Sequence, residues 1–124
     1  MRFGEVCVLS GNVRKLADFY RLILGIEGCA DGDDTWQLLL DGDVRLVIWD
    51  DGTPKTNNNT NMCLAFTCDD VDVEYQRLKE LEGIRIHFVE APHDSLHGYR
   101  SMCFYDIDGN KVFFRSSRTI GGHT

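Results

Sequence analysis

The two halves of this chain carry the same pattern of segments at a constant offset of 58 residues. Asn12 aligns with Asp70 (70 − 12), and Gly25 aligns with Gly83 (83 − 25). In each half an apolar segment precedes the Asn or Asp, and a helical pattern of apolar side chains fills the space before the glycine. A repeat of this length predicts two similar supersecondary units.

Both expected helices have recognisable start and stop signals. The apolar side chains of residues 13–24 and 71–82 recur at the three- and four-residue spacing that places them on one helical face. A side-chain acceptor before a helix binds free N–H groups of its first turn, and a glycine closes its end. The predicted caps are Asn12 and Asp70 at the starts and Gly25 and Gly83 at the ends.

The remaining segments have the composition of strands and turns. Turn signals are Asp41-Gly42-Asp43 and Asp108-Gly109, and the polar residues Thr56–Asn61 suit a connector. Each half therefore predicts the order strand, helix, strand, strand, strand. The expected strands are Glu5–Leu9, Ile26–Ala30, Trp36–Leu40 and Val44–Trp49 in the first half, and Cys63–Thr67, Ile84–Val89, Ser101–Tyr105 and Lys111–Arg115 in the second.

We therefore predict an α+β protein with one domain over residues 1–116, made of two βαβββ modules. Module one spans about residues 2–55, the connector spans 56–61, module two spans about 62–116, and 117–124 form a tail.

Charge and hydropathy exclude several classes of function. The net charge is −7 and the isoelectric point is near 4.9, so we expect no nucleic-acid partner. No apolar run approaches the roughly 20 residues that span a bilayer, so we expect no membrane association. The five cysteines include no CxxC pair, and the first residues do not read as a secretory signal. We expect free thiols and a cytoplasmic location.

Three short sequence words resemble those of a known family. They are Phe19-Tyr20-Arg21-Leu22-Ile23-Leu24-Gly25, Tyr99-Arg100, and Asp106-Ile107-Asp108-Gly109-Asn110. Together with the repeat, they make residues 2–116 similar to the vicinal oxygen chelate superfamily, the glyoxalase/bleomycin resistance/dioxygenase group. The resemblance implies curved mixed sheets around a cavity, helices outside, and a homodimer.

The resemblance also implies four metal-ligand positions, one on each of four strands. By motif register these are Glu5, Cys63, Phe113 and a position near Leu46, for which Arg45, Val47 and Ile48 are alternatives. A catalytic metal needs at least three protein ligands, and only Glu5 and Cys63 qualify. We expect no cofactor. The alternative is a divalent metal at Glu5 and Cys63, with a histidine from the polar loop around His93 and His97.

Strand alternation assigns side chains to the cavity. We expect Glu5 there either with a raised pKa or in a salt bridge with Arg45 or Arg115. We expect Cys63 to be a small buried apolar residue rather than a nucleophile. Phe113 and Trp49 either stack on a flat ligand or belong to the core. The candidate ligand-binding residues are Glu5, Cys7, Trp49, Cys63, Phe113 and Arg115.

Three functions remain open. The first is a binder of a small molecule in the cavity between the modules, without the four-ligand metal site, like bleomycin-resistance proteins. The second is a metal-dependent lyase, isomerase or dioxygenase with a rearranged site. The third is a regulatory module that docks a partner.

Overall fold

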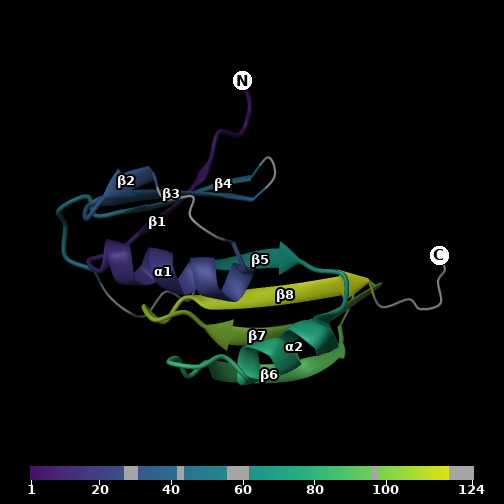
Figure 1. Cartoon of the computed structure of the whole chain (residues 1–124). Helices are drawn as coiled ribbons and strands as arrows, with labels where there is room; N and C mark the ends of the chain where they lie inside the picture. The colour runs from purple at the N-terminus through teal and green to yellow at the C-terminus, as the bar shows by residue number, and fades with distance from the viewer. Residues whose placement is uncertain (27–30, 42–43, 56–61, 96–97, 118–124) are drawn as a thin grey trace. The chain divides into compact units, whose positions relative to one another are not determined.

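The computed structural model describes residues 1–26, 31–41, 44–55, 62–95 and 98–117 (Figure 1). The chain divides into two compact units, Met1–Asn57 and Asn58–Thr124. Within the described ranges there are two helices and eight strands, which form two four-stranded mixed sheets. None of the helices there is both long enough and apolar enough to cross a bilayer.

Unit one consists of a helix on one face of a four-stranded sheet. The strand order is β1-β4-β3-β2; β1 runs parallel to β4, and the other neighbours are antiparallel. The elements are β1 (Val6–Leu9), α1 (Val13–Leu24), β2 (Asp31–Asp33), β3 (Trp36–Asp41) and β4 (Val44–Trp49).

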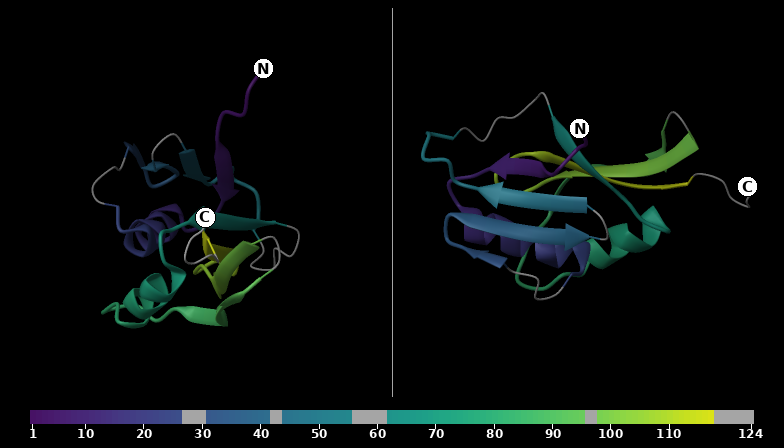
Figure 2. Two further views of the ribbon diagram at one scale, coloured as in Figure 1. Left: turned by 90° about the vertical axis from the view of Figure 1, so that its right-hand side faces the viewer. Right: turned by 90° about the horizontal axis from the view of Figure 1, so that it is seen from above.

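Unit two repeats this topology. Its strand order is β5-β8-β7-β6; β5 runs parallel to β8, and the other neighbours are antiparallel (Figures 1 and 2). The predicted α+β fold with two βαβββ modules is confirmed. The elements are β5 (Cys63–Thr67), α2 (Val71–Lys79), β6 (His87–Asp94), β7 (Tyr99–Tyr105) and β8 (Lys111–Ser117).

The core of unit one lies between α1 and its sheet. One face of α1 is fully buried, and the side chains beneath it come from alternate positions of β3 and β4. Burying one large aliphatic side chain contributes roughly 1.5–3 kcal/mol, so this layer dominates the stability of the unit. The buried side chains of this layer include Leu16, Ala17, Tyr20, Ile23, Leu39, Leu46 and Ile48.

The core of unit two relies more on aromatic rings. Phe104 makes edge-to-face contacts with Phe88 and Phe114, at centroid distances of 6.2 and 5.2 Å. Helix α2 buries only Val71 and Leu78 completely. The aromatic cluster on the sheet therefore supplies much of the apolar surface that this shorter helix does not.

Helix α1 has the predicted bounds, whereas α2 ends three residues early. Gly25 takes the left-handed conformation (φ 67°), and the Ile26 N–H reaches back to the Arg21 carbonyl at 3.1 Å. In α2 the Glu80 N–H donates to the Arg77 carbonyl at 3.2 Å, an i to i−3 bond that tightens the last turn. Gly83 (φ 78°) consequently lies in the turn that follows and not at the helix end.

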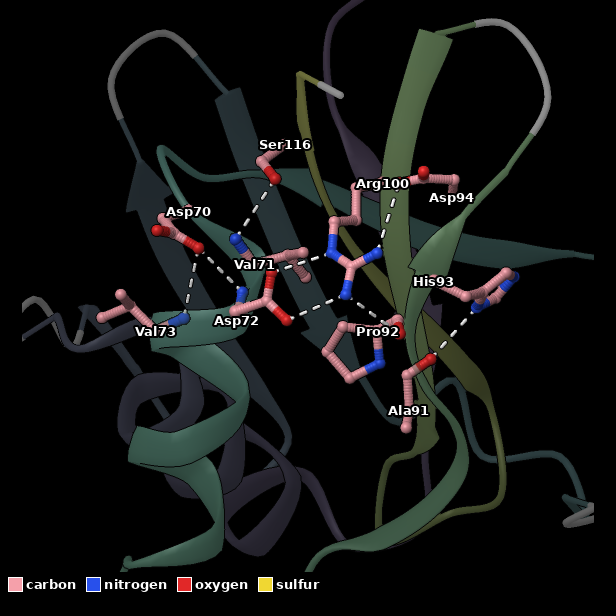
Figure 3. A network of polar contacts seen from close by, with 10 residues as sticks. All are labelled: Asp70, Val71, Asp72, Val73, Ala91, Pro92, His93, Asp94, Arg100 and Ser116. Carbon is pink, nitrogen blue, oxygen red and sulfur yellow. Dashed lines mark hydrogen bonds and ion pairs between the residues drawn. The ribbon is translucent and has the colours of Figure 1, made fainter. Parts of the chain in front are cut away.

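The two helix starts differ, although their residues are aligned. Asp70 accepts hydrogen bonds from the Asp72 and Val73 N–H groups at 3.0 and 3.3 Å, as predicted (Figure 3). The side chain of Asn12 makes no capping bond, so that prediction was wrong. Instead the Asn12 N–H donates to the Ser10 hydroxyl at 2.9 Å, so the side-chain acceptor lies two residues earlier.

The edge strand β6 departs from the sequence prediction. It begins at His87 and continues through His93 and Asp94, which we expected in a polar loop. The pairing of β6 with β7 shifts twice, between Phe88 and Glu90 and between Glu90 and His93. Pro92 lies in the second irregularity, on an edge strand, where a missing N–H is tolerated. His97 is outside the described residues.

Two other expectations fall largely outside the described residues. Of the strand expected at 26–30, residues 27–30 are not described, and neither are residues 42 and 43 of the expected first hairpin turn; the strand β2 begins at Asp31. Gly32 of β2 has φ 129°, and a Cβ there would lie 1.9 Å from the Trp36 carbonyl oxygen. Only glycine fits where β2 approaches β3 this closely.

Arg100 connects the start of α2 to the β6–β7 hairpin (Figure 3). Its guanidinium donates to both carboxylate oxygens of Asp72, at 2.8 and 3.1 Å, and to Asp94 at 3.2 Å. It also donates to the Pro92 carbonyl at 3.4 Å. The hydrogen bond from Arg100, together with its charge, lowers the pKa of Asp72. Arg100 thus holds helix and hairpin together.

Removing the Asp70 acceptor should cost more than removing the aligned Asn12. We expect Asp70→Ala to lower the free energy of unfolding by about 1 kcal/mol and Asn12→Ala by only a few tenths. Chemical denaturation of both variants measures this difference. Equal losses would show that Asn12 also contributes to its cap.

The contribution of the Asp72 carboxylate should depend on pH. Its folded-state pKa is lowered, so its stabilisation is complete above the unfolded pKa of about 3.9 and disappears as the pH falls through the folded value. We expect Asp72→Asn to melt below the parent at pH 7, and the difference to vanish towards about pH 2. Asp69→Asn, an equal charge change, is the control. A difference independent of pH would contradict the ion pair.

Candidate ligand-binding faces

The sheet face of unit one that points away from α1 carries four partly or fully exposed side chains, which we call face one: Cys7, Leu9, Trp36 and Trp49. Val6 and Val8, which alternate with Cys7 and Leu9 along β1, are half-buried on the helix side. The expected alternation along β1 is therefore present.

Three apolar side chains form a row across face one. Leu9 pairs with Trp49 across β1 and β4, and Trp49 pairs with Trp36 across β4 and β3. Leu9 and Trp49 are each 44% exposed. Trp49 therefore lies on an open apolar surface instead of in the core. Strand alternation in the sequence placed Leu9 on the cavity side but not among the ligand-binding candidates, and Trp36 was not considered, because only the register places both beside Trp49.

Glu5 lies immediately before β1, in an ion pair. One carboxylate oxygen is 3.6 Å from Nε of Arg45, and the other accepts a hydrogen bond from the Cys7 thiol at 3.5 Å. The Glu5 side chain is 40% exposed. Of the two readings left open for Glu5, the structure shows the salt bridge, with Arg45 as the partner.

The Cys7 thiol is a weak nucleophile. Desolvation raises its pKa, and the hydrogen bond to Glu5 and the charge of Glu5 add to this. Burial likewise raises the pKa of Cys68 to about 11 and that of the Cys103 thiol. Since the thiolate is the reactive form, these three side chains are unsuited to nucleophilic chemistry. Cys7, Cys63, Cys68 and Cys103 are free thiols in the described part of the chain.

The sheet face of unit two that points away from α2 carries a second set, which we call face two: Ala65, Thr67, Phe113 and Arg115. Ala65 pairs with Phe113, and Thr67 pairs with Arg115. Phe113 is half-buried, which is intermediate between the two expectations for it, a side chain that stacks on a ligand and a side chain of the core. Cys63 is exposed at the start of β5, so its expected burial was wrong.

Arg115 contacts two aromatic rings. Its guanidinium carbon is 5.7 Å from the ring centroids of Tyr99 and of Phe113. Tyr99 belongs to β7 and is 41% exposed. Sequence reasoning paired Arg115 with Glu5 as one option and did not consider Tyr99, because β7 begins two residues earlier than predicted and the register that brings Tyr99 next to Arg115 follows only from strand pairing.

A family model matches residues 2–114. Its description is the glyoxalase/bleomycin resistance protein/dioxygenase superfamily. The chain belongs to this superfamily. The resemblance inferred from the sequence words is confirmed. No curated protein matches the chain.

Several solved structures share the fold of this chain. A protein of unknown function from Agrobacterium tumefaciens str. C58 is 21% identical, with a TM-score of 0.77 and 94% coverage of both chains. A lactoylglutathione lyase from Agrobacterium tumefaciens is 21% identical, with a TM-score of 0.70 and coverage of 98% of this chain and 97% of that one. The fosfomycin resistance protein FosX from Listeria monocytogenes is 17% identical, with a TM-score of 0.68 and coverage of 96% and 98%.

Strand pairing identifies the metal-ligand position on β4, which the superfamily resemblance placed near Leu46. Cys7 pairs with Val47 as Ala65 pairs with Phe113, so Val47 is the counterpart of Phe113. Leu46 points to the helix side, and the placement near Leu46 was therefore off by one residue. Val47 is among the alternatives considered.

The side chains at these four positions do not supply the four donor atoms that a metal ion bound by four protein ligands needs. Val47 and Phe113 have hydrocarbon side chains, and the Glu5 carboxylate already pairs with Arg45. Among the residues with described positions, no three His, Cys, Asp or Glu side chains gather closely enough to hold an ion. His93 is exposed on β6, with Nδ1 3.0 Å from the Ala91 carbonyl oxygen.

Replacing Glu5 should make Cys7 more reactive. In Glu5→Gln the charge that helps to raise the Cys7 pKa is gone, so we expect alkylation by iodoacetamide at pH 8 to become about twofold faster. Peptide mapping by mass spectrometry measures the rate at each cysteine. Buried Cys103 is the internal control, and an unchanged Cys7 rate would contradict the Glu5–Cys7 contact.

Proposed function

We propose that this superfamily member binds a small organic molecule on its exposed sheet faces and does so without a bound metal ion. The observation that carries the proposal is the chemistry of the four aligned positions. Two of them, Val47 and Phe113, offer no donor atom, and a third, Glu5, is engaged by Arg45. A site with one remaining thiol is below the three ligands that a catalytic metal requires.

The row of Leu9, Trp49 and Trp36 supports a binding role. These large apolar side chains are exposed to water. Removing apolar surface from water is favourable by roughly 25 cal/mol per Å². A flat or apolar molecule lying on Trp49 would recover this energy, and an indole ring provides an extended stacking surface. Candidate ligand-binding residues are therefore Trp49 with Cys7 and Glu5 nearby on unit one, and Phe113, Arg115 and Cys63 on unit two.

Metal ions should leave the stability of the protein nearly unchanged. An ion that binds only the folded state at a hundred times its dissociation constant adds about 2.7 kcal/mol of stability. We expect Zn²⁺, Ni²⁺, Mn²⁺ and Fe²⁺ each to shift the melting temperature by less than about 1 °C, both in the parent and in Glu5→Ala. A rise of more than about 5 °C that Glu5→Ala abolishes would favour the metal-dependent lyase, isomerase or dioxygenase instead.

Binding itself can be followed by tryptophan emission, because Trp36 and Trp49 are the only tryptophans in the sequence. In the presence of a chelator we expect a saturable change with at least one of bleomycin, fosfomycin and lactoylglutathione. The change should be largely lost in Trp49→Phe and reduced in Trp36→Phe, whereas Val73→Ala, which shortens an exposed apolar side chain of α2, is the control and should respond as the parent does. No saturable change with any of the three would contradict the proposal.

A further inference from the structure

The guanidinium of Arg115 differs from those of five other arginines in its partners. Arg14, Arg21, Arg45, Arg77 and Arg100 each form an ion pair with a carboxylate. Arg115 is half-buried, and its side chain has no carboxylate partner within the described ranges. Its recorded side-chain contacts are the rings of Tyr99 and Phe113.

This environment favours an added anion. Aromatic rings attract the cation through their π electrons but accept no hydrogen bond in the plane of the guanidinium. The five N–H donors of Arg115 are therefore available to an acceptor in that plane. A carboxylate fits best, because its two oxygens match two parallel N–H groups.

The neighbours of Arg115 add hydroxyl and apolar groups. Thr67 and Ser101 pair with Arg115 from either side, on β5 and β7. The next row toward the start of β8 is Ala65, Phe113 and Cys103, which is apolar. Other ionisable side chains on the same face are Lys111 on β8, four residues before Arg115, and two on the edge strand β6: His93, which pairs with Ser101, and Glu90, which pairs with Cys103.

We infer that face two binds the carboxylate of a flat aromatic acid, with the carboxylate on Arg115 and the aromatic ring against Phe113 and Ala65. This inference rests on the proposed function and specifies its ligand class. Thr67 is exposed beside Arg115, so its hydroxyl group can donate to a carboxylate oxygen that lies on Arg115.

The test is an NMR titration of the full-length, ¹⁵N-labelled protein with benzoate. We expect saturable shifts of the backbone amides of Thr67, Ser101, Phe113 and Arg115. Benzamidine, a cation of the same shape, should not produce them. Inorganic phosphate should shift the Arg115 amide more weakly, because it lacks the aromatic ring. Shifts of equal size with phosphate and benzoate would overturn the assignment of an aromatic acid.

Three variants test the residues. Arg115→Met should weaken benzoate binding at least about tenfold, and Arg115→Lys should weaken it about fivefold, since lysine keeps the charge but loses the planar fork. Phe113→Leu should weaken benzoate binding more than phosphate binding. Arg85→Met, which removes an exposed arginine outside face two, is the control for net charge and should bind as the parent does.

The outcomes separate this inference from the proposed function. Unchanged benzoate binding in a folded Arg115→Met variant, or no benzoate shifts at all, would overturn it. If this inference is overturned but tryptophan emission still responds to bleomycin, fosfomycin or lactoylglutathione, the binding function at face one stands without the anion site. If neither face responds, both proposals fail.

Discussion

The parallel pairing of the first and last strands of each unit is the constraint on which the rest depends. A parallel pair needs a long crossover, and here the helix and two strands between β1 and β4, or between β5 and β8, provide it. The helix covers one sheet face, so alternate side chains of the paired strands point toward the helix and away from it. The positions of Trp49 and Arg115 follow from this division.

Two of the sequence words stabilise the ends of these crossovers. In the first, Phe19 and Tyr20 are buried, Arg21 donates to Gln37 on β3, and Gly25 closes the helix. In the second, the buried Asp106 carboxylate accepts hydrogen bonds from the Asp108 and Asn110 N–H groups and from the Asn110 side chain, which fixes the turn between β7 and β8.

The two units share a topology but present different chemistry on their exposed faces. Face one offers indole rings, and the nearby carboxylate of Glu5 is paired with Arg45. Face two offers Arg115, held by two rings and without a carboxylate partner in the described part of the chain. At the equivalent positions Val47 on β4 and Phe113 on β8, however, both units carry hydrocarbon side chains.

The sequence by itself determined the repeat, the bounds of α1, β4 and β5, and the family, because these follow from local periodicity, from glycines at helix ends and turns, and from short sequence motifs. It also predicted Glu5 and Arg45 as one possible pair. The tertiary structure alone decided the early end of α2, the path of β6 through Pro92, and the contacts of Arg115 with Tyr99 and Phe113. These depend on strand register and edge position, which come from pairing between segments distant along the chain.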